Sequence, residues 1–270
     1  MSPLRKPAPH MGAPLLLVDN SNTLTKFALV EPGECQPSRL RTCSTAAISP
    51  AELRHTLRGW TYGHAVLCSV APAAGKLLGE LLCSPVERIG PESCPQLLRG
   101  YASPDTLGAD RIANAAAVAA CYPLPCVAVD LGTACTFDLV VEEPQGPRFA
   151  GGAISPGLHT AAAALAEKTA CLPRFLPEEL REEPVPGACG QGTRQAMLAG
   201  LRYGFRGMVQ GVLDELSRPL AQKPCVVLTG GDAALAADLT GYTTYIDNLL
   251  TLKGILSLHR ERNRFFTPGA

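Results

Sequence analysis

Two stretches of the chain share one design: LLLVDNSNTLTKFALV at residues 15–30 and CVAVDLGTACTFDLVV at residues 126–141. Each begins with an apolar run that is typical of a buried strand and that ends on an aspartate, Asp19 or Asp130. A turn of small and hydroxyl-bearing residues follows, and a second apolar run returns. The two copies lie about 110 residues apart, so the pattern predicts two similarly folded halves.

The composition indicates a folded chain without a strongly charged partner. Of the 270 residues, 46% are hydrophobic, which is enough for a full core and excludes disorder over most of the length. Lys plus Arg and Asp plus Glu number 24 each, so the net charge is zero. Such a chain has no general field that would attract nucleic acid or an anionic membrane, and neither partner is expected.

Cysteine usage and the N-terminal sequence favour a cytoplasmic protein. The apolar run from Leu15 to Val18 is far too short for a signal peptide or a membrane span. The 11 cysteines form no CxxC motif and no Cys/His cluster with zinc spacing. We therefore expect most of them to be buried small hydrophobic residues in a reducing compartment.

Strand-like and helix-like stretches alternate after residue 14, which predicts an α/β fold. Strands are expected at residues 15–19, 25–30, 64–70, 126–130, 136–141 and 225–231. Helices are expected from Pro72 to about residue 82 and at about 108–121, 157–168, 193–216 and 249–262. Residues 84–107 are interpreted as irregular, and residues 172–190 as a loop rich in Pro and Glu.

These elements predict a division of the chain into four parts. Residues 1–13 are expected to form a flexible tail, because they combine Pro, Gly and basic residues without periodicity. Residues 14–124 are expected to form an N-terminal domain, and residues 125–248 a C-terminal domain. The helix within residues 249–270 is expected to pack back on the first domain.

The two aspartates lie where open α/β sheets bind ligands, at the carboxyl ends of buried strands. Followed by a turn of small residues, such an aspartate can hold a cation while N–H groups and hydroxyls meet phosphate oxygens. One aspartate alone is weak evidence, because Asp commonly starts a turn for local reasons. A third turn, Thr229-Gly230-Gly231, follows another strand. The sequence contains neither GxxxxGK[ST] nor GxGxxG.

Three such turns resemble the split nucleotide site of the sugar kinase, heat-shock ATPase and actin superfamily. This resemblance implies an α/β fold of two duplicated actin-like (ribonuclease H-like) domains with a cleft between them. It also implies that two phosphate loops face each other across the cleft and that a later Gly-Gly turn approaches the adenosine.

Further motifs narrow the resemblance to type III pantothenate kinases, over nearly everything after residue 14. The segment Gly108-Ala109-Asp110-Arg111, with Tyr101 seven positions before its glycine, is the most family-specific element. The other shared motifs are Asp19–Thr23 with Lys26, Asp130–Ala134, Gly151–Gly157, Thr169–Pro173, Thr193 with Met197 and Gly200, Thr229–Gly231 and Thr251–Gly254. The resemblance implies ATP-dependent phosphorylation of pantothenate to 4'-phosphopantothenate, the first step of coenzyme A biosynthesis.

The resemblance also implies a role for individual residues. Asp110 is the implied general base, although an aspartate in the first turn of a helix also complements the helix dipole. An arginine suits a carboxylate substrate because its fork binds both oxygens, and Thr193 suits an ordinary N-cap as well as a ligand contact. The implied substrate-binding residues are Tyr101, Gly108, Ala109, Asp110, Arg111 and Thr193.

ATP with Mg²⁺ is the implied cofactor, together with a monovalent cation, K⁺ or NH₄⁺, held by Asp130. The implied ATP-binding residues are Asp19, Asn20, Ser21, Asn22, Thr23, Leu24, Thr25 and Lys26 in the first loop and Thr133 in the second. Members of the family are homodimers. The apolar face of residues 193–216 is a candidate for the subunit contact, although core packing explains that face equally well.

Ser21 departs from the family pattern, which normally has glycine there. If the position needs a positive φ, a non-glycine residue costs on the order of 1–2 kcal/mol, whereas the serine could instead donate a hydrogen bond. Ser21 therefore leaves open the hypothesis that the chain is a catalytically weak or inactive family member that acts as a binding or regulatory protein. A sugar or acid kinase is a third hypothesis, which the motif around Tyr101 and Asp110 disfavours.

Overall fold

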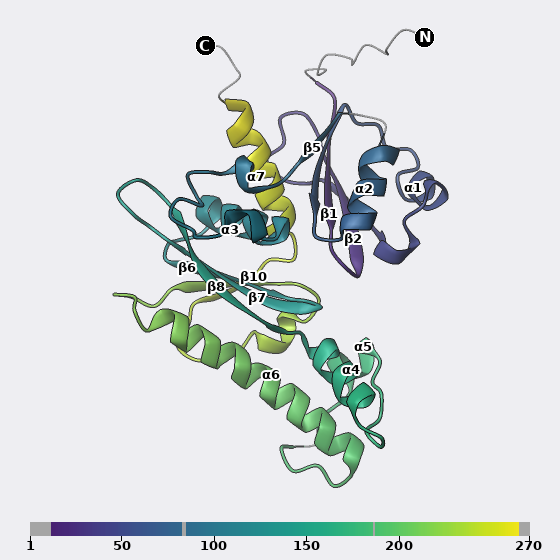
Figure 1. Ribbon diagram of the computed structural model, residues 1–270, viewed down its shortest axis with the longest axis vertical. Helices are drawn as coiled ribbons and strands as arrows, with labels where there is room; N and C mark the ends of the chain where they lie inside the picture. The colour runs from purple at the N-terminus through teal and green to yellow at the C-terminus, as the bar shows by residue number, and fades with distance from the viewer. Residues whose placement is uncertain (1–11, 83–84, 186, 265–270) are drawn as a thin grey trace. The chain divides into compact units, whose positions relative to one another are not determined.

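The computed structural model describes residues 12–82, 85–185 and 187–264 (Figure 1). The chain divides into two compact units, here called the N-terminal unit (Met1–Ala120 with Leu249–Ala270) and the C-terminal unit (Cys121–Asn248). Each unit contains one five-stranded sheet. The tail expected at residues 1–13 lies outside the described residues, apart from residues 12 and 13.

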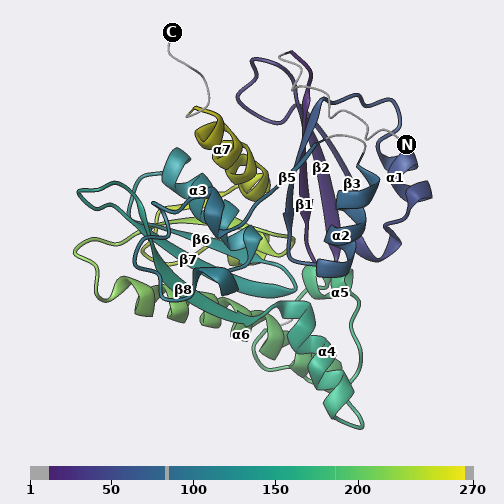
Figure 2. The same cartoon turned by 45° about the horizontal axis from the view of Figure 1, so that its top comes forward.

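The N-terminal unit is built on a sheet with the strand order β3-β2-β1-β4-β5. The strands are β1 (Leu15–Asn20), β2 (Leu24–Val30), β3 (Arg39–Ser44), β4 (His64–Ser69) and β5 (Val86–Arg88). The helices are α1 (Pro50–Thr56), α2 (Pro72–Leu81), α3 (Ala109–Cys121) and α7 (Leu250–Arg264), with short 3-10 turns at Thr45–Ala47, Pro91–Ser93 and Pro104–Thr106. Figure 2 shows α1 and α2 on one side of this sheet and α7 on the other.

Strand alternation explains why this sheet is covered on both sides. Leu16 and Val18 of β1 belong to a buried cluster with Leu53 of α1 and Leu78 of α2. Leu17, between them in sequence, is also fully buried and points to the opposite face, because side chains alternate along a strand.

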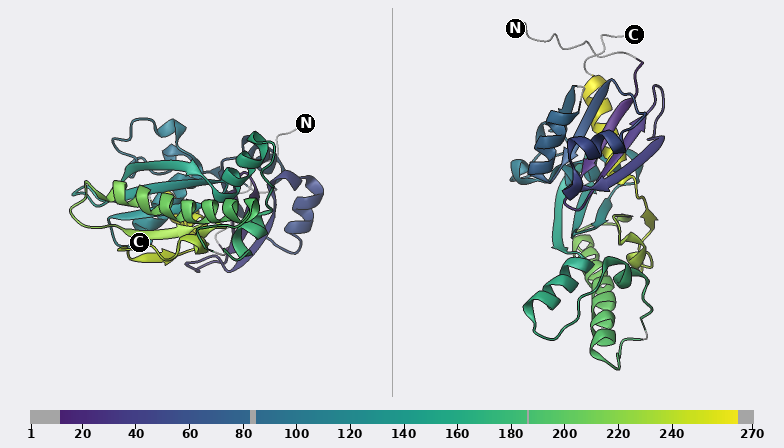
Figure 3. Two further views of the ribbon diagram at one scale, coloured as in Figure 1. Left: turned by 90° about the horizontal axis from the view of Figure 1, so that it is seen from below. Right: turned by 90° about the vertical axis from the view of Figure 1, so that its right-hand side faces the viewer.

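The C-terminal unit has the strand order β10-β9-β6-β7-β8. The strands are β6 (Cys126–Leu131), β7 (Ala134–Val141), β8 (Arg148–Pro156), β9 (Cys225–Thr229) and β10 (Thr244–Ile246). The helices are α4 (Leu158–Lys168), α5 (Pro177–Glu182) and α6 (Thr193–Ser217), with a 3-10 turn at Ala233–Ala236. The long helix α6 runs along one side of this sheet (Figure 3), and its Phe205, Val209 and Leu213 join the buried core of the unit.

The two sheets repeat one topology. In each, a hairpin of two antiparallel strands (β1 with β2, β6 with β7) is flanked by a third antiparallel strand and by a parallel strand (β4 or β9) on the other side. The duplicated α/β fold that was predicted from the two aspartate hairpins is thereby confirmed.

Two segments that the sequence analysis interpreted as irregular or as loops contain regular structure. Val86–Arg88 form β5, which pairs in parallel with β4, and Pro177–Glu182 form α5. The three-residue strand and the six-residue helix are too short to show a periodic pattern. Both are stabilised by tertiary contacts, such as the burial of Leu180 of α5 in the core.

Thr193 does not cap α6, contrary to one expectation. The N-cap residue is Gly192, no side chain accepts a capping hydrogen bond, and Thr193 is the first helical residue. The apolar face that includes Met197 and Leu201 packs into the core of its own unit, which is the alternative to a subunit contact that the sequence analysis considered. Among the described residues, no helix is long and apolar enough to cross a membrane.

Candidate functional site

The first loop connects β1 to β2 and places an acid and a base side by side. Asp19 and Lys26 are directly paired across the hairpin, and Lys26 Nζ lies 3.6 Å from Asp19 Oδ2. Asp19 is 6% exposed, whereas the Lys26 side chain is 24% exposed and reaches solvent. The loop therefore offers an ammonium group to an anionic ligand while its partner carboxylate stays largely buried.

A buried hydrogen-bond network braces this loop from behind. Asn20 donates to Thr25 Oγ1 at 2.8 Å and accepts from Ser69 Oγ at 2.7 Å. Thr45 Oγ1 lies 2.9 Å from Thr25 Oγ1 and donates to the Ser21 carbonyl at 2.7 Å. Asn20 and Thr25 are thus structural members of the loop, and their hydrogen-bonding groups are engaged inside it. The sequence analysis did not identify Thr45 or Ser69, which the hairpin meets only in the folded unit.

Ser21 adopts no strained conformation. No non-glycine residue among those that the structure describes has a positive φ, so the strain considered for Ser21 is absent. Its hydroxyl donates to the Leu24 carbonyl at 2.8 Å, and its N–H points to the same carbonyl at 3.2 Å. The serine closes the turn, which leaves the exposed residues Asn22 and Thr23 at the tip.

The second loop connects β6 to β7 and is anchored by the start of α4. The Thr133 carbonyl accepts from Gly157 N at 3.1 Å and from Thr160 Oγ1 at 2.6 Å. Gly157 lies so close to the loop that a Cβ atom there would overlap the Gly132 carbonyl oxygen and lie 2.8 Å from that of Thr133. The close approach of Gly157 to the second loop therefore leaves no room for a side chain, and Thr133 itself is exposed.

Asp130 lies between the second loop and the Gly-Gly turn after β9. Gly230 has a φ of +88°, and a Cβ on it would lie 2.6 Å from Asp130 Oδ1 and 2.5 Å from the Leu131 carbonyl oxygen. The Leu131 carbonyl accepts from Asp232 N at 3.0 Å, which fixes the turn against the strand. A half-buried carboxylate among backbone carbonyls is a donor set of hard oxygens, which fits a cation such as K⁺ or Mg²⁺.

Asp110 lies in the first turn of α3 and is packed against Gly108. Its Oδ1 accepts the Arg111 N–H at 2.7 Å, and a Cβ on Gly108 would lie 2.6 Å from the same oxygen. Burial raises the pKa of Asp110, while the Arg111 N–H and the Arg111 charge act in the opposite direction. The carboxylate is therefore both held in place and made more basic than an exposed aspartate.

Asp110 lies near the end of β4 that adjoins the first loop, because a Cβ on Gly108 would lie 2.6 Å from Asp110 Oδ1 and 3.5 Å from Val70, whose N–H donates to the Asn20 carbonyl at 3.0 Å. Burial raises the pKa of the Cys68 thiol well above its usual value, and the charges of Asp19 and Asp110 raise it further. Cys68 is paired with Asp19 across the parallel strands β1 and β4. The fold thus brings the most family-specific aspartate to the edge of the sheet that carries the first loop.

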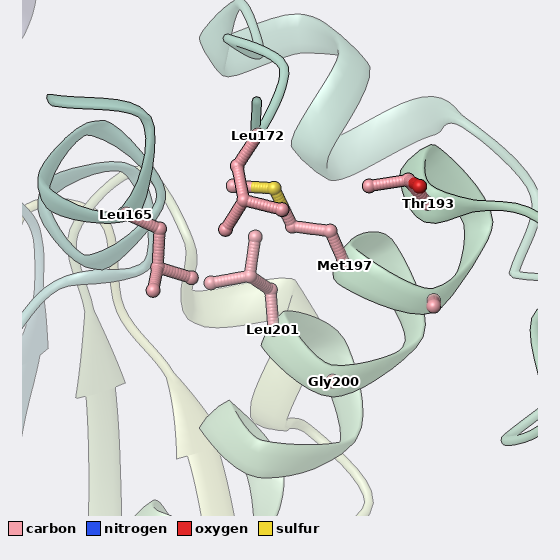
Figure 4. A pocket seen from close by; sticks show the side chains of 7 residues that line it. Leu165, Leu172, Thr193, Met197, Gly200 and Leu201 are labelled. Carbon is pink, nitrogen blue, oxygen red and sulfur yellow. The ribbon is translucent and has the colours of Figure 1, made fainter. Parts of the chain in front are cut away.

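The other residues that were expected to contact the substrate differ in burial and in the unit to which they belong. Arg111 and Ala109 are buried in α3, and Tyr101 is half-buried in the segment before it. Thr193 belongs to the C-terminal unit, where it lines a cavity of about 480 Å³. Figure 4 shows Leu165, Leu172, Met197 and Leu201 gathered around this cavity, with Thr193 at one side. Leu165 and Leu172 were not among the expected site residues, because leucines on a helix and a loop carry no signal that distinguishes a ligand pocket from a core.

Comparison with solved structures supports the fold. A conserved Campylobacter jejuni protein described as a Baf family transcriptional activator is similar, with a TM-score of 0.58 at 18% identity, covering 92% of this chain and 99% of that one. An archaeal actin homologue has a TM-score of 0.50 at 12% identity, covering 93% of this chain and 99% of that one. At these identities, the likeness concerns the actin-like architecture alone.

Sequence comparison identifies the family. A type III pantothenate kinase from Akkermansia muciniphila is 39% identical over 242 residues, which are 89% of this chain and 96% of that protein. The model of the type III pantothenate kinase family matches residues 15–215, which include both aspartate loops, Asp110 and Thr193. The chain belongs to the type III pantothenate kinase family.

Proposed function

We propose that this chain transfers the γ-phosphoryl group of ATP to the primary hydroxyl of pantothenate, the first step of coenzyme A biosynthesis. As a kinase of this family, it uses ATP with a divalent metal. The observation that carries the proposal is that Asp110 lies beside Gly108 and Val70, at the end of β4 where the Val70 N–H donates to the Asn20 carbonyl of the first loop. Phosphoryl transfer to an alcohol requires such a pair, a carboxylate for the hydroxyl proton and a loop for the phosphates.

Asp110 is the proposed general base. Its Oδ1 is held by the Arg111 N–H, and the raised pKa of the carboxyl makes it a better proton acceptor than an exposed aspartate. Because a base works best when its pKa approaches the working pH, the burial of Asp110 serves the reaction at a cost in folding stability. In this scheme Asp110 takes the hydroxyl proton as the oxygen attacks the γ-phosphorus, and ADP leaves.

The two loops are proposed to hold the nucleotide. Lys26 and the exposed tip residues Asn22 and Thr23 face the phosphates in the first loop, and Thr133 does so in the second. Mg²⁺ supplies charge neutralisation on the phosphates when it is bound. Asp130 is proposed to hold K⁺ or NH₄⁺, because its carboxylate lies beside Gly132 and Gly230 together with the backbone oxygens of Leu131 and Ala134.

Arg111, Tyr101 and the backbone of Gly108 and Ala109 are proposed to bind pantothenate, with the guanidinium on the substrate carboxylate. Thr193 is proposed as a further substrate contact. We place the reaction in the cytoplasm, in line with the ten cysteines of the described residues, all of which are free thiols.

A homodimer is also part of the proposal, through a face other than the one first considered. The side of α6 away from the core exposes Gly204 and Gly207 next to Tyr203, which is 46% exposed. Small residues at this spacing let two helices approach closely, and an exposed tyrosine is a typical interface residue. Sedimentation of the purified chain tests this, since Gly204→Trp should shift a dimer to monomer and leave a monomer unchanged.

A panel of acceptors tests the proposed activity against its alternatives. Purified chain with ATP, Mg²⁺ and K⁺ is offered pantothenate, glucose, glycerol or acetate, and ADP is measured in a coupled assay. ADP formation that depends on pantothenate is expected. Preference for a sugar or for acetate would assign a different kinase activity. No ADP formation with any acceptor would support the binding or regulatory alternative, which the family assignment does not favour.

A further inference from the structure

A cluster outside the proposed kinase machinery joins three elements of the N-terminal unit. His64 begins β4, Glu87 lies in the middle of β5 and His259 lies on α7. Glu87 is paired with Val66 across the parallel strands, and His64 shares the face of Val66 because side chains alternate along a strand. His259 extends the buried stripe of α7 formed by Leu252, Ile255 and Leu256.

The side chains converge on one carboxylate oxygen. His259 Nδ1 lies 2.7 Å and His64 Nε2 lies 3.6 Å from Glu87 Oε2. One ligand atom from each of the three residues lies within 4.8 Å of the other two. The two imidazole rings are 5.4 Å apart at an angle of 31°, so their nitrogens approach the carboxylate from neighbouring directions.

We propose that His64, Glu87 and His259 form a binding site for a divalent transition metal, with Zn²⁺ as the best-matched ion. Two imidazoles and one carboxylate are a ligand set that Zn²⁺ accepts, and ligand atoms about 2.1 Å from a tetrahedral ion lie about 3.4 Å apart. The two distances from Glu87 Oε2, 2.7 and 3.6 Å, bracket that separation, and the two histidine nitrogens lie within 4.8 Å of each other.

The surroundings of the cluster suit a metal ligand. The second carboxylate oxygen, Glu87 Oε1, is buried and makes no hydrogen bond within the described residues. Movement of the carboxylate toward an ion therefore breaks no hydrogen bond at Oε1. Arg262 lies 3.5 Å from Oε1 and is placed to orient the carboxylate as an outer partner. The side chains of His64 and His259 remain 30% and 19% exposed, which leaves access for the ion and for a water as fourth ligand.

The bound ion would tie α7 to the sheet. The same helix donates from Thr251 Oγ1 to Asn114 Oδ1 of α3 at 2.9 Å, and α3 carries Asp110. The proposed metal would therefore stabilise the N-terminal unit, and none of its three ligands is a residue to which phosphoryl transfer is assigned.

Equilibrium dialysis of the full chain with Zn²⁺ tests the site. The variants are His64→Gln and His259→Gln, in which the glutamine can still hydrogen-bond Glu87, and the matched control is His55→Gln at an exposed histidine of α1. We expect one Zn²⁺ per chain for wild type and the control, and an affinity more than about 100-fold lower for the two variants, because outer partners alone cost 10–100-fold. Zn²⁺ should raise the Tm of wild type and of His55→Gln only.

Equal Zn²⁺ affinity in wild type and His259→Gln, or no binding by wild type, would overturn the proposal. Because exposed cysteines compete for Zn²⁺, the spectrum of wild-type chain loaded with Co²⁺ gives an independent readout that needs no variant. A tetrahedral spectrum without thiolate charge transfer supports the site, whereas a thiolate band or an octahedral spectrum counts against it.

Discussion

Replacing Gly157 by alanine should displace the second phosphate loop. The φ of −71° and ψ of 165° at Gly157 suit any residue, so the backbone itself adds no strain. The new Cβ would lie 2.8 Å from the Thr133 carbonyl oxygen, and an ordinary contact begins at 3.4 Å. The Thr133 carbonyl must therefore retreat by about 0.6 Å (3.4 − 2.8), and the Gly132 carbonyl, which the Cβ overlaps, must retreat further.

Both obstacles are backbone atoms, so no side chain can rotate out of the way. Overpacking of this kind typically costs about 1–3 kcal/mol of folding stability. A displacement approaching 1 Å at a phosphate-positioning loop can cost on the order of 100-fold in rate. We expect Gly157→Ala to lower the Tm, raise the KM for ATP and lower kcat, while the KM for pantothenate changes little.

The matched control is Ala164→Gly at an exposed position of the same helix, α4. Glycine in a helix costs about 1 kcal/mol through backbone entropy, so this variant loses comparable stability without touching the loop. Thermal unfolding and steady-state kinetics on both variants separate the two effects. If Gly157→Ala keeps the wild-type KM for ATP, or if Ala164→Gly changes it equally, the steric argument is refuted.

Three further predictions concern Asp110, Thr160 and Asp130. Burial raises the pKa of Asp110, so the fold is more stable with this carboxyl neutral than with it ionised. The neutral Asp110 carboxyl makes its full contribution to folding stability below the pKa of about 3.9 that it has in the unfolded chain, and this contribution is lost as the pH rises through the higher pKa of the folded state. Asp110→Asn should therefore match or exceed the wild-type Tm at pH 8. A clearly lower Tm at pH 8 would contradict this. Thr160→Val removes the 2.6 Å hydrogen bond to the Thr133 carbonyl and should cost about 1 kcal/mol while raising the KM for ATP; an unchanged KM would argue against anchoring by α4. Activity should require K⁺ or NH₄⁺ and lose that dependence in Asp130→Asn, so full activity of wild type in Na⁺ alone would exclude the proposed role of Asp130.

The hairpins that define the fold could be predicted because their signal is local. The apolar runs before Asp19 and Asp130 and the small-residue turns after them are complete within 16 residues each. The helix that begins near Asp110 was predicted for the same reason. In contrast, β5 is three residues long and forms because β4 supplies its partner, which no local pattern shows.

The sequence could name candidate residues of the site, but it could not predict which of their side chains hydrogen-bond to one another within the folded loop. Family resemblance selected Asn20 and Thr25 as nucleotide contacts, whereas the folded loop uses their side chains for bracing with Thr45 and Ser69. The strain considered for Ser21 is absent, because this residue has no positive φ and its hydroxyl donates to the Leu24 carbonyl within the turn. Such roles depend on contacts between distant segments.

The turnover of Asp110→Asn tests the central claim most directly. Asparagine keeps the shape and can still accept the Arg111 N–H, but it cannot accept a proton from the substrate hydroxyl. The account predicts a kcat lower by about 10²–10⁴-fold, with pantothenate binding measured by calorimetry within a few-fold of wild type. A kcat close to that of wild type would contradict the assignment of Asp110 as the base.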